Sequence, residues 1–311
     1  MRQYDILLFG EYFFDVIYTG LTEFPISGRE IFSTGITSTG GAMFTTACAL
    51  ARLGVNHGWP ATFGDDNYSQ FVTTLAARER IDLSLARFLD EPFRRVTTSL
   101  PLHGERAFVT YADPERADKY DYWLQMMQHV QFRHIHFGGL EAPDDVAPMI
   151  ELAHKRGATV SMDCHDTPLL ADLTCDWPRY LEGIDIFTPN MREAMLITRT
   201  SDARSAVHQL SQWVQVVLVK DGGNGAWVGQ GGEIALVPSH KVGEVIDTTG
   251  AGDAFMAALI SGVLEAGDEL EDQLVEIGRF ACAAGAITTT SKGAIPALPT
   301  RQQVYDFLSA N

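Results

Sequence analysis

Short apolar runs alternate with segments of helical period along most of this chain. The pattern predicts strands at residues 4–9, 57–63, 134–137, 158–162, 184–187 and 216–219, and helices between them at 42–53, 68–80, 144–155, 192–197 and 203–213. Runs such as ILLF and VVLV are continuously apolar, which is typical of strands buried on both faces. The alternation therefore predicts an α/β core, in which helices flank a mostly parallel central sheet in three layers.

Two segments break this alternation. Residues 11–36 and 95–112 contain short β-like pieces separated by turn residues, and neither shows a helical pattern. Each is too short to enclose a core of its own. We therefore predict that 11–36 and 95–112 form a small β-sheet lid over the carboxyl edge of the main sheet. The core then comprises 1–10, 37–94 and 113–311.

The last third of the chain changes character, because residues 250–265 and 270–288 predict two long, mostly apolar helices. With 311 residues, 46% of them apolar, the chain has enough material for one large domain. Its four cysteines are spread out with no C-x-x-C pair, which indicates free thiols in a reducing compartment.

The charge balance restricts the partners of the protein. Lys and Arg number 23 and Asp and Glu 40, which gives a net charge of −17 that repels polyanions. Asp5 and Glu11 interrupt any secretory signal at the start, and the longest strongly apolar stretch, 254–264, is shorter than the ~20 residues of a membrane span. We expect a cytoplasmic protein that binds neither nucleic acid nor membrane.

Several common catalytic motifs are absent from the sequence. It contains no G-x-x-x-x-G-K-[ST], no H-E-x-x-H and no G-x-S-x-G, and its first strand is followed by GEYF rather than a dinucleotide fingerprint. His134 and His136 point to the same face of a strand but lack a third ligand, so we expect them to be packed or hydrogen-bonded.

The most specific motif is DTTGAGDAF at residues 247–255, where a loop meets the first long apolar helix. Gly250 and Gly252 lack a Cβ where backbone must approach a ligand, and the free N–H groups of the first helical turn attract an anion. A carboxylate here opposes binding of a phosphate, but Asp253 suits a base that takes a proton from an attacking hydroxyl. The alternative is an ordinary acid at a helix start.

The chain resembles the PfkB family of carbohydrate kinases, which has the ribokinase-like fold. The resemblance rests on DTTGAGDAF, on Gly40-Gly41 at the opening of an early helix, and on Asn190-x-x-Glu193 after Thr188-Pro189, and it covers essentially the whole chain. It implies ATP-dependent phosphorylation of a hydroxyl on a sugar or nucleoside. It also allows a homodimer formed through the lid.

The resemblance assigns roles on the phosphate side of the site. Asp253 matches the catalytic base, and the backbone of Gly250, Ala251 and Gly252 matches the anion hole. Asn190 and Glu193 match the pair that positions Mg²⁺ through water; a helix cap with an exposed Glu is the alternative. The resemblance assigns contacts with ATP to Lys220, Gly222, Gly225, Thr248 and Thr249. It assigns the binding of a monovalent cation, K⁺, to Asp247. A Gly-rich hairpin turn is the alternative for residues 220–226.

On the acceptor side, Asp15 matches an early acid that binds substrate hydroxyls, and Gly40 and Gly41 let the substrate lie against backbone. Thr45 stands where many members have Asn, which leaves the substrate open. A nucleoside kinase is an alternative, with Phe13, Phe14 or Phe108 as stacking partners. A kinase for a hydroxymethyl-pyrimidine usually lacks a complete lid. A non-catalytic sugar or nucleotide sensor would not need Asp253.

Overall fold

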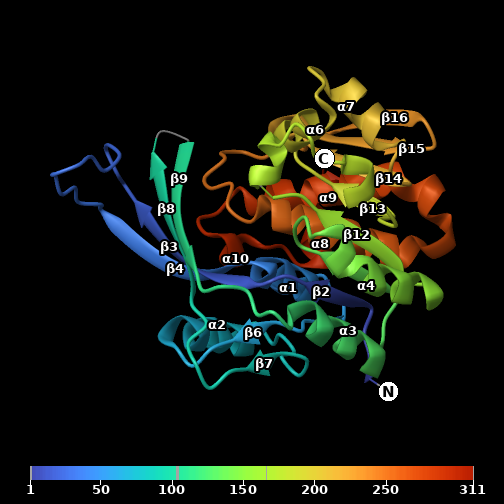
Figure 1. The fold of residues 1–311 in the computed structure, drawn as a ribbon. Helices are drawn as coiled ribbons and strands as arrows, with labels where there is room; N and C mark the ends of the chain where they lie inside the picture. Colours follow the sequence, from blue (N-terminus) through green and yellow to red (C-terminus); the bar gives the residue numbers. More distant parts are fainter. Residues whose placement is uncertain (1, 103–104, 166, 311) are drawn as a thin grey trace.

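The central sheet has eight strands in the order β16-β15-β14-β13-β12-β11-β2-β5 (Figure 1), in a computed structural model that describes residues 2–102, 105–165 and 167–310. The strands from β14 to β5 are parallel, and β15 and β16 extend the sheet as an antiparallel hairpin. Their bounds are β2 (Ile6–Phe9), β5 (His57–Gly58), β11 (His134–Phe137), β12 (Thr159–Asp163), β13 (Ile186–Thr188), β14 (Val216–Lys220), β15 (Gly225–Gln230) and β16 (Glu233–Pro238).

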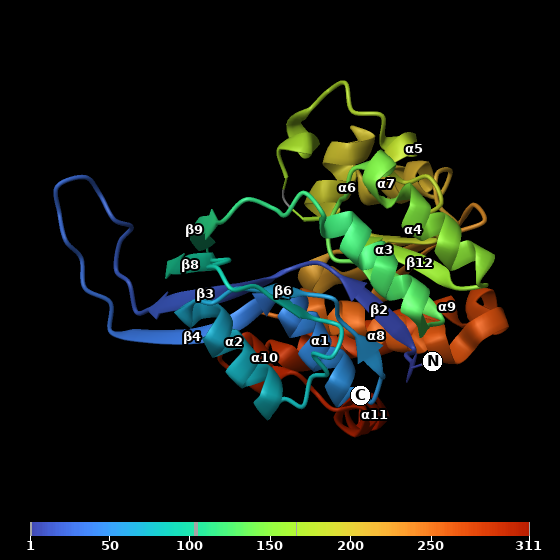
Figure 2. The same ribbon diagram turned by 60° about the horizontal axis from the view of Figure 1, so that its bottom comes forward.

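Helices cover both faces of this sheet, as Figure 2 shows, so the three-layer α/β prediction is confirmed. One face packs on α3 (Lys119–His129), α4 (Pro143–Lys155), α5 (Trp177–Tyr180), α6 (Met191–Thr198) and α7 (Ala203–Leu210). The other packs on α1 (Met43–Arg52), α8 (Ala251–Ala266), α9 (Leu270–Thr288), α10 (Ala294–Ala297) and α11 (Arg301–Ala310), with α2 (Asn67–Arg78) at its margin. Short pieces complete the chain: β1 (Arg2–Gln3), β6 (Thr62–Phe63), β7 (Arg87–Phe88), β10 (Val130–Gln131), η1 (Pro168–Ala171), η2 (Gly222–Asn224) and η3 (Gly267–Glu269).

A second sheet, here called the lid sheet, stands away from the core (Figure 1). Its order is β4-β3-β8-β9, built from β3 (Tyr12–Thr19), β4 (Gly35–Ala42), β8 (Arg95–Leu102) and β9 (Glu105–Ala112). The turn predicted at residues 103–104 lies outside the described residues. The two predicted lid segments thus pair with one another in a single sheet.

The boundary of the first lid segment differs from the prediction. Residues 37–42, which the sequence assigns to the core, belong to β4, because β3 pairs with β4 without a break from Tyr12↔Ala42 to Thr19↔Gly35. Gly40 and Gly41 therefore end a lid strand, and the helix opens after them at Met43. Among the described helices, none is long and apolar enough to cross a membrane.

Candidate active site

The candidate site lies where the parallel strands end. Asp163 ends β12 and Lys220 ends β14, while Gly10, Gly138 and Asn190 follow β2, β11 and β13 closely. Because these strands are parallel, their carboxyl ends meet at one edge of the sheet, which is where open α/β sheets bind ligands. The start of α8 approaches the same edge, since Asp253 interacts electrostatically with both Asp163 and Lys220.

The first turn of α8 offers backbone donors. Gly250 is the N-cap with φ of 79°, and a Cβ there would lie 2.7 Å from that of Ala294, so only glycine fits. The N–H of Ala251 donates to the Thr248 carbonyl at 3.3 Å. Helix geometry gives the N–H groups of Gly252 and Asp253 no intrahelical acceptor, and the space beside Gly252 is open. The exposed part of the predicted anion hole therefore centres on Gly252.

The carboxyl group of Asp253 is held from α1. The Thr46 hydroxyl donates to Asp253 Oδ1 at 2.8 Å. Burial raises the pKa of Asp253 to about 6, while the Thr46 hydrogen bond and the charge of His165 oppose that rise. A carboxyl with a pKa near neutrality is suited to accept a proton during reaction.

Asp15, on the lid sheet, lies close enough to Asp253 to be affected by its charge. Burial, and next the negative charge of Asp253, raise the pKa of Asp15 to about 7. A Cβ on Gly41 would lie 2.0 Å from Asp15 Oδ2, so the missing side chain of Gly41 makes room for this carboxyl. Gly40 is needed for a different contact, because a Cβ there would lie 2.2 Å from the ring of Phe44. The two glycines thus support the site through packing.

Thr45 makes a different contact from Thr46, whose hydroxyl reaches Asp253. Thr45 is buried, and its hydroxyl donates to the Gly40 carbonyl at 3.4 Å. The residue that reaches Asp253 is the next one along the helix, which sequence reasoning missed. The missed signal is a second hydroxyl, Thr46, adjacent to the position where the family pattern has Asn.

Lys220 forms an ion pair with Asp163. Its Nζ donates to Oδ1 at 2.7 Å and to Oδ2 at 2.9 Å, and both side chains are mostly buried. Burial is the largest influence and would raise the pKa of Asp163, but the charges of Lys220, His165 and His136 and the hydrogen bond from Lys220 together hold that pKa below its usual range. Sequence analysis predicted Lys220 as a cation for the ATP phosphates and missed Asp163, an acid that ends a buried apolar strand.

Asn190 and Glu193 form a reciprocal cap at the start of α6. The Glu193 N–H donates to Asn190 Oδ1 at 2.9 Å, and the Asn190 N–H donates to Glu193 Oε2 at 2.8 Å. Glu193 is 4% exposed, so the pair differs from a cap with an exposed Glu. Burial raises the pKa of Glu193 despite the hydrogen bond from Asn190 and the nearby charge of Lys220.

The two loops predicted to contact ATP are well anchored. Gly225 is fixed by packing, since a Cβ there would lie 2.0 Å from the Val237 carbonyl oxygen, whereas the space beside Gly222 is open. Asp247 Oδ1 accepts hydrogen bonds from the N–H and the hydroxyl of Thr249 at 2.9 and 2.6 Å, and its Oδ2 accepts from the Gly293 N–H at 2.9 Å. Asp247 thereby ties the loop before α8 to the loop before α10.

Histidines lie both in and beneath the site. His165 follows β12, is exposed, and acts electrostatically on Asp253, Asp163 and Glu193; sequence analysis missed it. His134 and His136 are buried and hydrogen-bond to Ser161 at 2.7 and 2.8 Å. Within the described ranges no three His, Cys, Asp or Glu side chains gather as a metal site would require.

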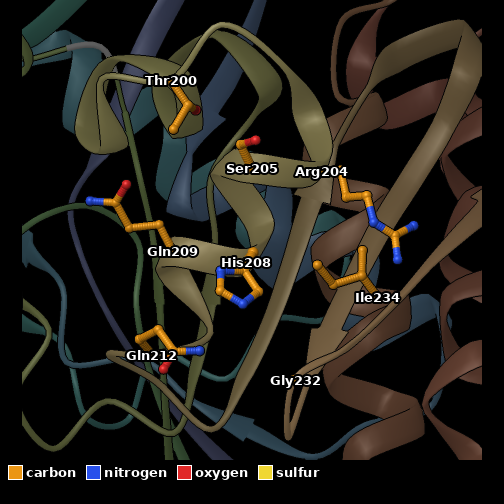
Figure 3. A pocket seen from close by; sticks show the side chains of 8 residues that line it. All are labelled: Thr200, Arg204, Ser205, His208, Gln209, Gln212, Gly232 and Ile234. Atoms are coloured by element: carbon orange, nitrogen blue, oxygen red, sulfur yellow. The ribbon is translucent and has the colours of Figure 1, made fainter.

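An open cavity lies elsewhere on the molecule. It measures about 570 Å³ and lies between α7 and the β15–β16 turn, as Figure 3 shows. Its wall is largely polar: Thr200, Arg204, Ser205, His208, Gln209, Gln212, Gly232 and Ile234. None of the residues that the motifs single out lines it, so we place the chemistry at the edge that carries Asp253.

Comparison with known proteins identifies the family of the chain. The model of the pfkB family carbohydrate kinases matches residues 9–301. The chain belongs to this family. As a pfkB-family kinase it is an ATP-dependent phosphotransferase that acts on a sugar hydroxyl, which confirms the predicted reaction class.

Relatives of this pfkB-family kinase span its full length. Fructokinase-2 of Zea mays is 29% identical, with 98% of this chain and 94% of the relative covered. The 2-dehydro-3-deoxygluconokinase of Bacillus subtilis is also 29% identical, with 98% and 96% covered. The solved structure of Arabidopsis thaliana ribokinase complexed with ribose and ATP has a TM-score of 0.77 at 24% identity, with 99% of each chain covered, which confirms the ribokinase-like fold.

Proposed function

We propose that the enzyme transfers the γ-phosphoryl group of ATP to a hydroxyl of a ketose sugar, with fructose as the first candidate. The observation that carries this proposal is a pair of buried carboxyl groups whose charges act on each other, Asp15 on the lid sheet and Asp253 at the start of α8. Carboxylates that accept hydrogen bonds from hydroxyl groups give directional recognition of a polyol. The similarity to a maize fructokinase supports the choice of sugar.

In this mechanism Asp15 orients the acceptor by accepting a hydrogen bond from one of its hydroxyls. Asp253 takes the proton of the attacking hydroxyl. The hydroxyl oxygen forms a bond to the γ-phosphorus while the bond to the bridging oxygen breaks and leaves its electrons on ADP. The N–H groups of the first turn of α8, chiefly that of Gly252, stabilise the charge on the transferring group.

Mg²⁺ fits the nucleotide side of the site through water. In the cap, Asn190 Oδ1 and Glu193 Oε2 already accept backbone hydrogen bonds, so this buried pair is better suited to hold a metal-bound water than to enclose the ion. When bound with ATP, Mg²⁺ neutralises charge on the phosphates. We assign the ATP phosphates to the loops of Gly222 and Thr248–Thr249, with Lys220 at their border.

A monovalent cation is proposed at the loop of Asp247. Both of its carboxylate oxygens accept hydrogen bonds within the two loops they join, so a cation there would use remaining lone pairs and backbone carbonyls. Activity in KCl is expected to exceed activity in tetramethylammonium chloride at equal ionic strength. Equal rates in the two salts would contradict the cation site and leave the kinase assignment untouched.

The test of the main proposal is ATP consumption with a panel of pure acceptors. Fructose, ribose, 2-dehydro-3-deoxygluconate and a nucleoside are compared at equal concentration, with Asp253→Asn as the matched inactive variant. The highest kcat/KM is expected for fructose. A sugar acid is the second candidate, because the Bacillus subtilis relative is equally identical; a higher kcat/KM for it, or for the nucleoside, would replace the ketose assignment.

The lid sheet also supports a proposal of homodimerisation. It exposes large apolar side chains far from the core packing, with Val109 66% and Ile36 62% exposed, and β4 and β9 are its unpaired edges. A second copy of the chain would cover them. Val109→Glu is expected to shift the protein from dimer to monomer in sedimentation velocity. Leu173→Glu, at a position 74% exposed on the core, is the control that should leave the mass unchanged. A monomeric wild-type protein would contradict the proposal.

A further inference from the structure

Thr46 uses its hydroxyl in an unusual way for a helical threonine. A threonine inside a helix commonly donates to the carbonyl four residues earlier. In this chain Thr74, Thr198 and Thr288 do so, to Gln70, Ala194 and Ala284 at 2.7, 2.8 and 2.9 Å. Thr46, which is 5% exposed within α1, instead donates to the Asp253 carboxyl, 207 residues away, at 2.8 Å.

The contact joins two helices that pack against each other. Thr46 lies in the early part of α1 and Asp253 in the first turn of α8, and α1 packs directly on α8. The turn that precedes α1 is strained, because Ala42 has φ of 52° and ψ of −133°. A neutral hydroxyl held in this position can donate to the carboxylate without competing with it for the substrate proton.

We propose that Thr46 is a positioning residue, which occupies Oδ1 of Asp253 so that Oδ2 is the atom that receives the acceptor proton. The inference rests on the proposed role of Asp253 as the base. The acceptor O–H bond breaks and its proton moves to Oδ2. The oxygen lone pair forms the new bond to phosphorus, and the bond to the bridging oxygen of ATP breaks.

The surroundings of Asp253 make this hydrogen bond important for its protonation. Charged or titratable groups act on it from every side: Asp15 from the lid sheet, Cys48 from α1, Asp163 from β12, His165 from the loop after β12 and Lys220 from β14. Burial is the largest influence and raises the pKa, and the Thr46 hydrogen bond is the largest influence in the opposite direction. Without the hydroxyl, the base would stay protonated at higher pH.

The experiment is a pH profile of kcat/KM for the accepted sugar in Thr46→Val, Thr46→Ser and wild type. Valine keeps the shape and removes the donor, and serine keeps the donor. Loss of a hydrogen bond to a charged group is expected to move the acidic limb of the Thr46→Val profile upward by about one pH unit, with activity recovering at alkaline pH. Thr46→Ser should keep the wild-type midpoint.

Thr198→Val is the matched control for removing a buried helical hydroxyl. Thr198 has the same 5% exposure, but its hydroxyl donates to a backbone carbonyl in α6 and does not reach Asp253. Its profile should superimpose on that of the wild type. If Thr46→Val does not fold, as judged by thermal unfolding, Thr46→Ala takes its place in the same comparison.

Two outcomes would overturn the inference. A Thr46→Val profile that superimposes on wild type shows that the hydroxyl does not affect the base, and a loss of equal size at every pH shows a structural role only. Failure of the underlying function is detected separately. If Asp253→Asn retains full activity, Asp253 is not the base, whatever the Thr46 variants show.

Discussion

The carboxyl groups on the two sides of the candidate site have pKa values that are shifted in opposite directions. On the proposed acceptor side, the charge of Asp253 acts on Asp15, neither carboxyl group forms an ion pair among the described residues, and their pKa values are raised to about 7 for Asp15 and about 6 for Asp253. On the nucleotide side, Asp163 is paired with Lys220, and its pKa lies below its usual range. Among the carboxyl groups of this site, Asp15 and Asp253 can therefore exchange a proton near neutral pH, whereas Asp163 keeps a fixed charge.

This difference suits the roles that we propose for the two sides. A base has to take up a proton during the reaction and give it back, so its pKa must lie near the working pH. A group that borders the nucleotide phosphates must keep its charge and position while the substrates come and go. Among the described residues Asp163 has a paired cation and Asp253 has none, which suits the two proposed roles.

The difference between the two sides is tested most strongly by replacing the proposed base, Asp253. Asp253→Asn keeps the shape and the Thr46 contact but cannot take a proton. We expect kcat to fall by about three orders of magnitude, with the KM for ATP changed little. Steady-state kinetics with the preferred acceptor measure both. A variant that keeps more than a tenth of the wild-type kcat would show that the acceptor-side carboxyls have no proton-transfer role.

The nucleotide side is tested through stability. Lys220→Met leaves Asp163 buried without its cation and is expected to lower the free energy of unfolding by about 3–5 kcal/mol. In the double variant Lys220→Met/Asp163→Asn no unpaired charge remains, so most of this loss should be recovered. Urea unfolding of the wild type, the two single variants and the double variant gives the interaction free energy between Lys220 and Asp163. Additive losses would show that the two side chains act independently.

Local patterns were enough to predict much of the fold. Continuously apolar runs located β2 and β14, and shorter runs of apolar or β-branched residues located β11, β12 and β13, all within one or two residues. Helix α3 was not predicted, because its buried positions, Lys119, Trp123 and Met127, include a charged residue and so disguise the helical period. The hairpin of β15 and β16 was not predicted as strands either; β16 buries little, with only Val237 fully enclosed.

Site residues that belong to a contiguous motif could be predicted from the sequence. Side chains whose partner lies far away along the chain could not be paired. The strings around Asp253 and Asn190 pointed to residues that the structure brings to one sheet edge. Lys220 looked like a free cation, because the chain places Asp163 57 residues away and only the parallel order of β12, β13 and β14 brings them together. Thr46 was missed for the same reason, since its partner lies on another helix.

A smaller test disturbs the space that Asp15 occupies. Gly41→Ala places a Cβ 2.0 Å from Asp15 Oδ2, so the carboxyl group must move. We expect the KM for the acceptor to rise by up to about a hundredfold, while the KM for ATP stays within about twofold. Gly243→Ala, where a Cβ meets nothing within 4 Å, is the control and should leave both constants unchanged. A matching rise in both constants would indicate general damage.

The smallest expected effect comes from pH. If Asp15 must be ionised to accept a hydroxyl, the acceptor KM should rise about tenfold as the pH falls one unit below the Asp15 pKa of about 7. Asp15→Asn should flatten this dependence at a uniformly higher KM. A wild-type KM that does not vary between about pH 8 and pH 6 would show that Asp15 does not need its charge.

The free energy of unfolding should fall as the pH rises, whereas binding of the acceptor should become stronger. The pKa of Asp15 is raised in the folded protein, so the folded state holds the proton more tightly than the unfolded chain, in which the pKa is about 4. The stability linked to this proton is complete below about pH 4 and is lost as the pH rises through about 7. The Asp15→Asn variant should therefore gain stability relative to the wild type as the pH rises from about 4 to about 8. Urea unfolding of both proteins at the two pH values measures this gain. If Asp15 binds the acceptor as we propose, the ionised form that binds the substrate is also the form that lowers the stability of the fold.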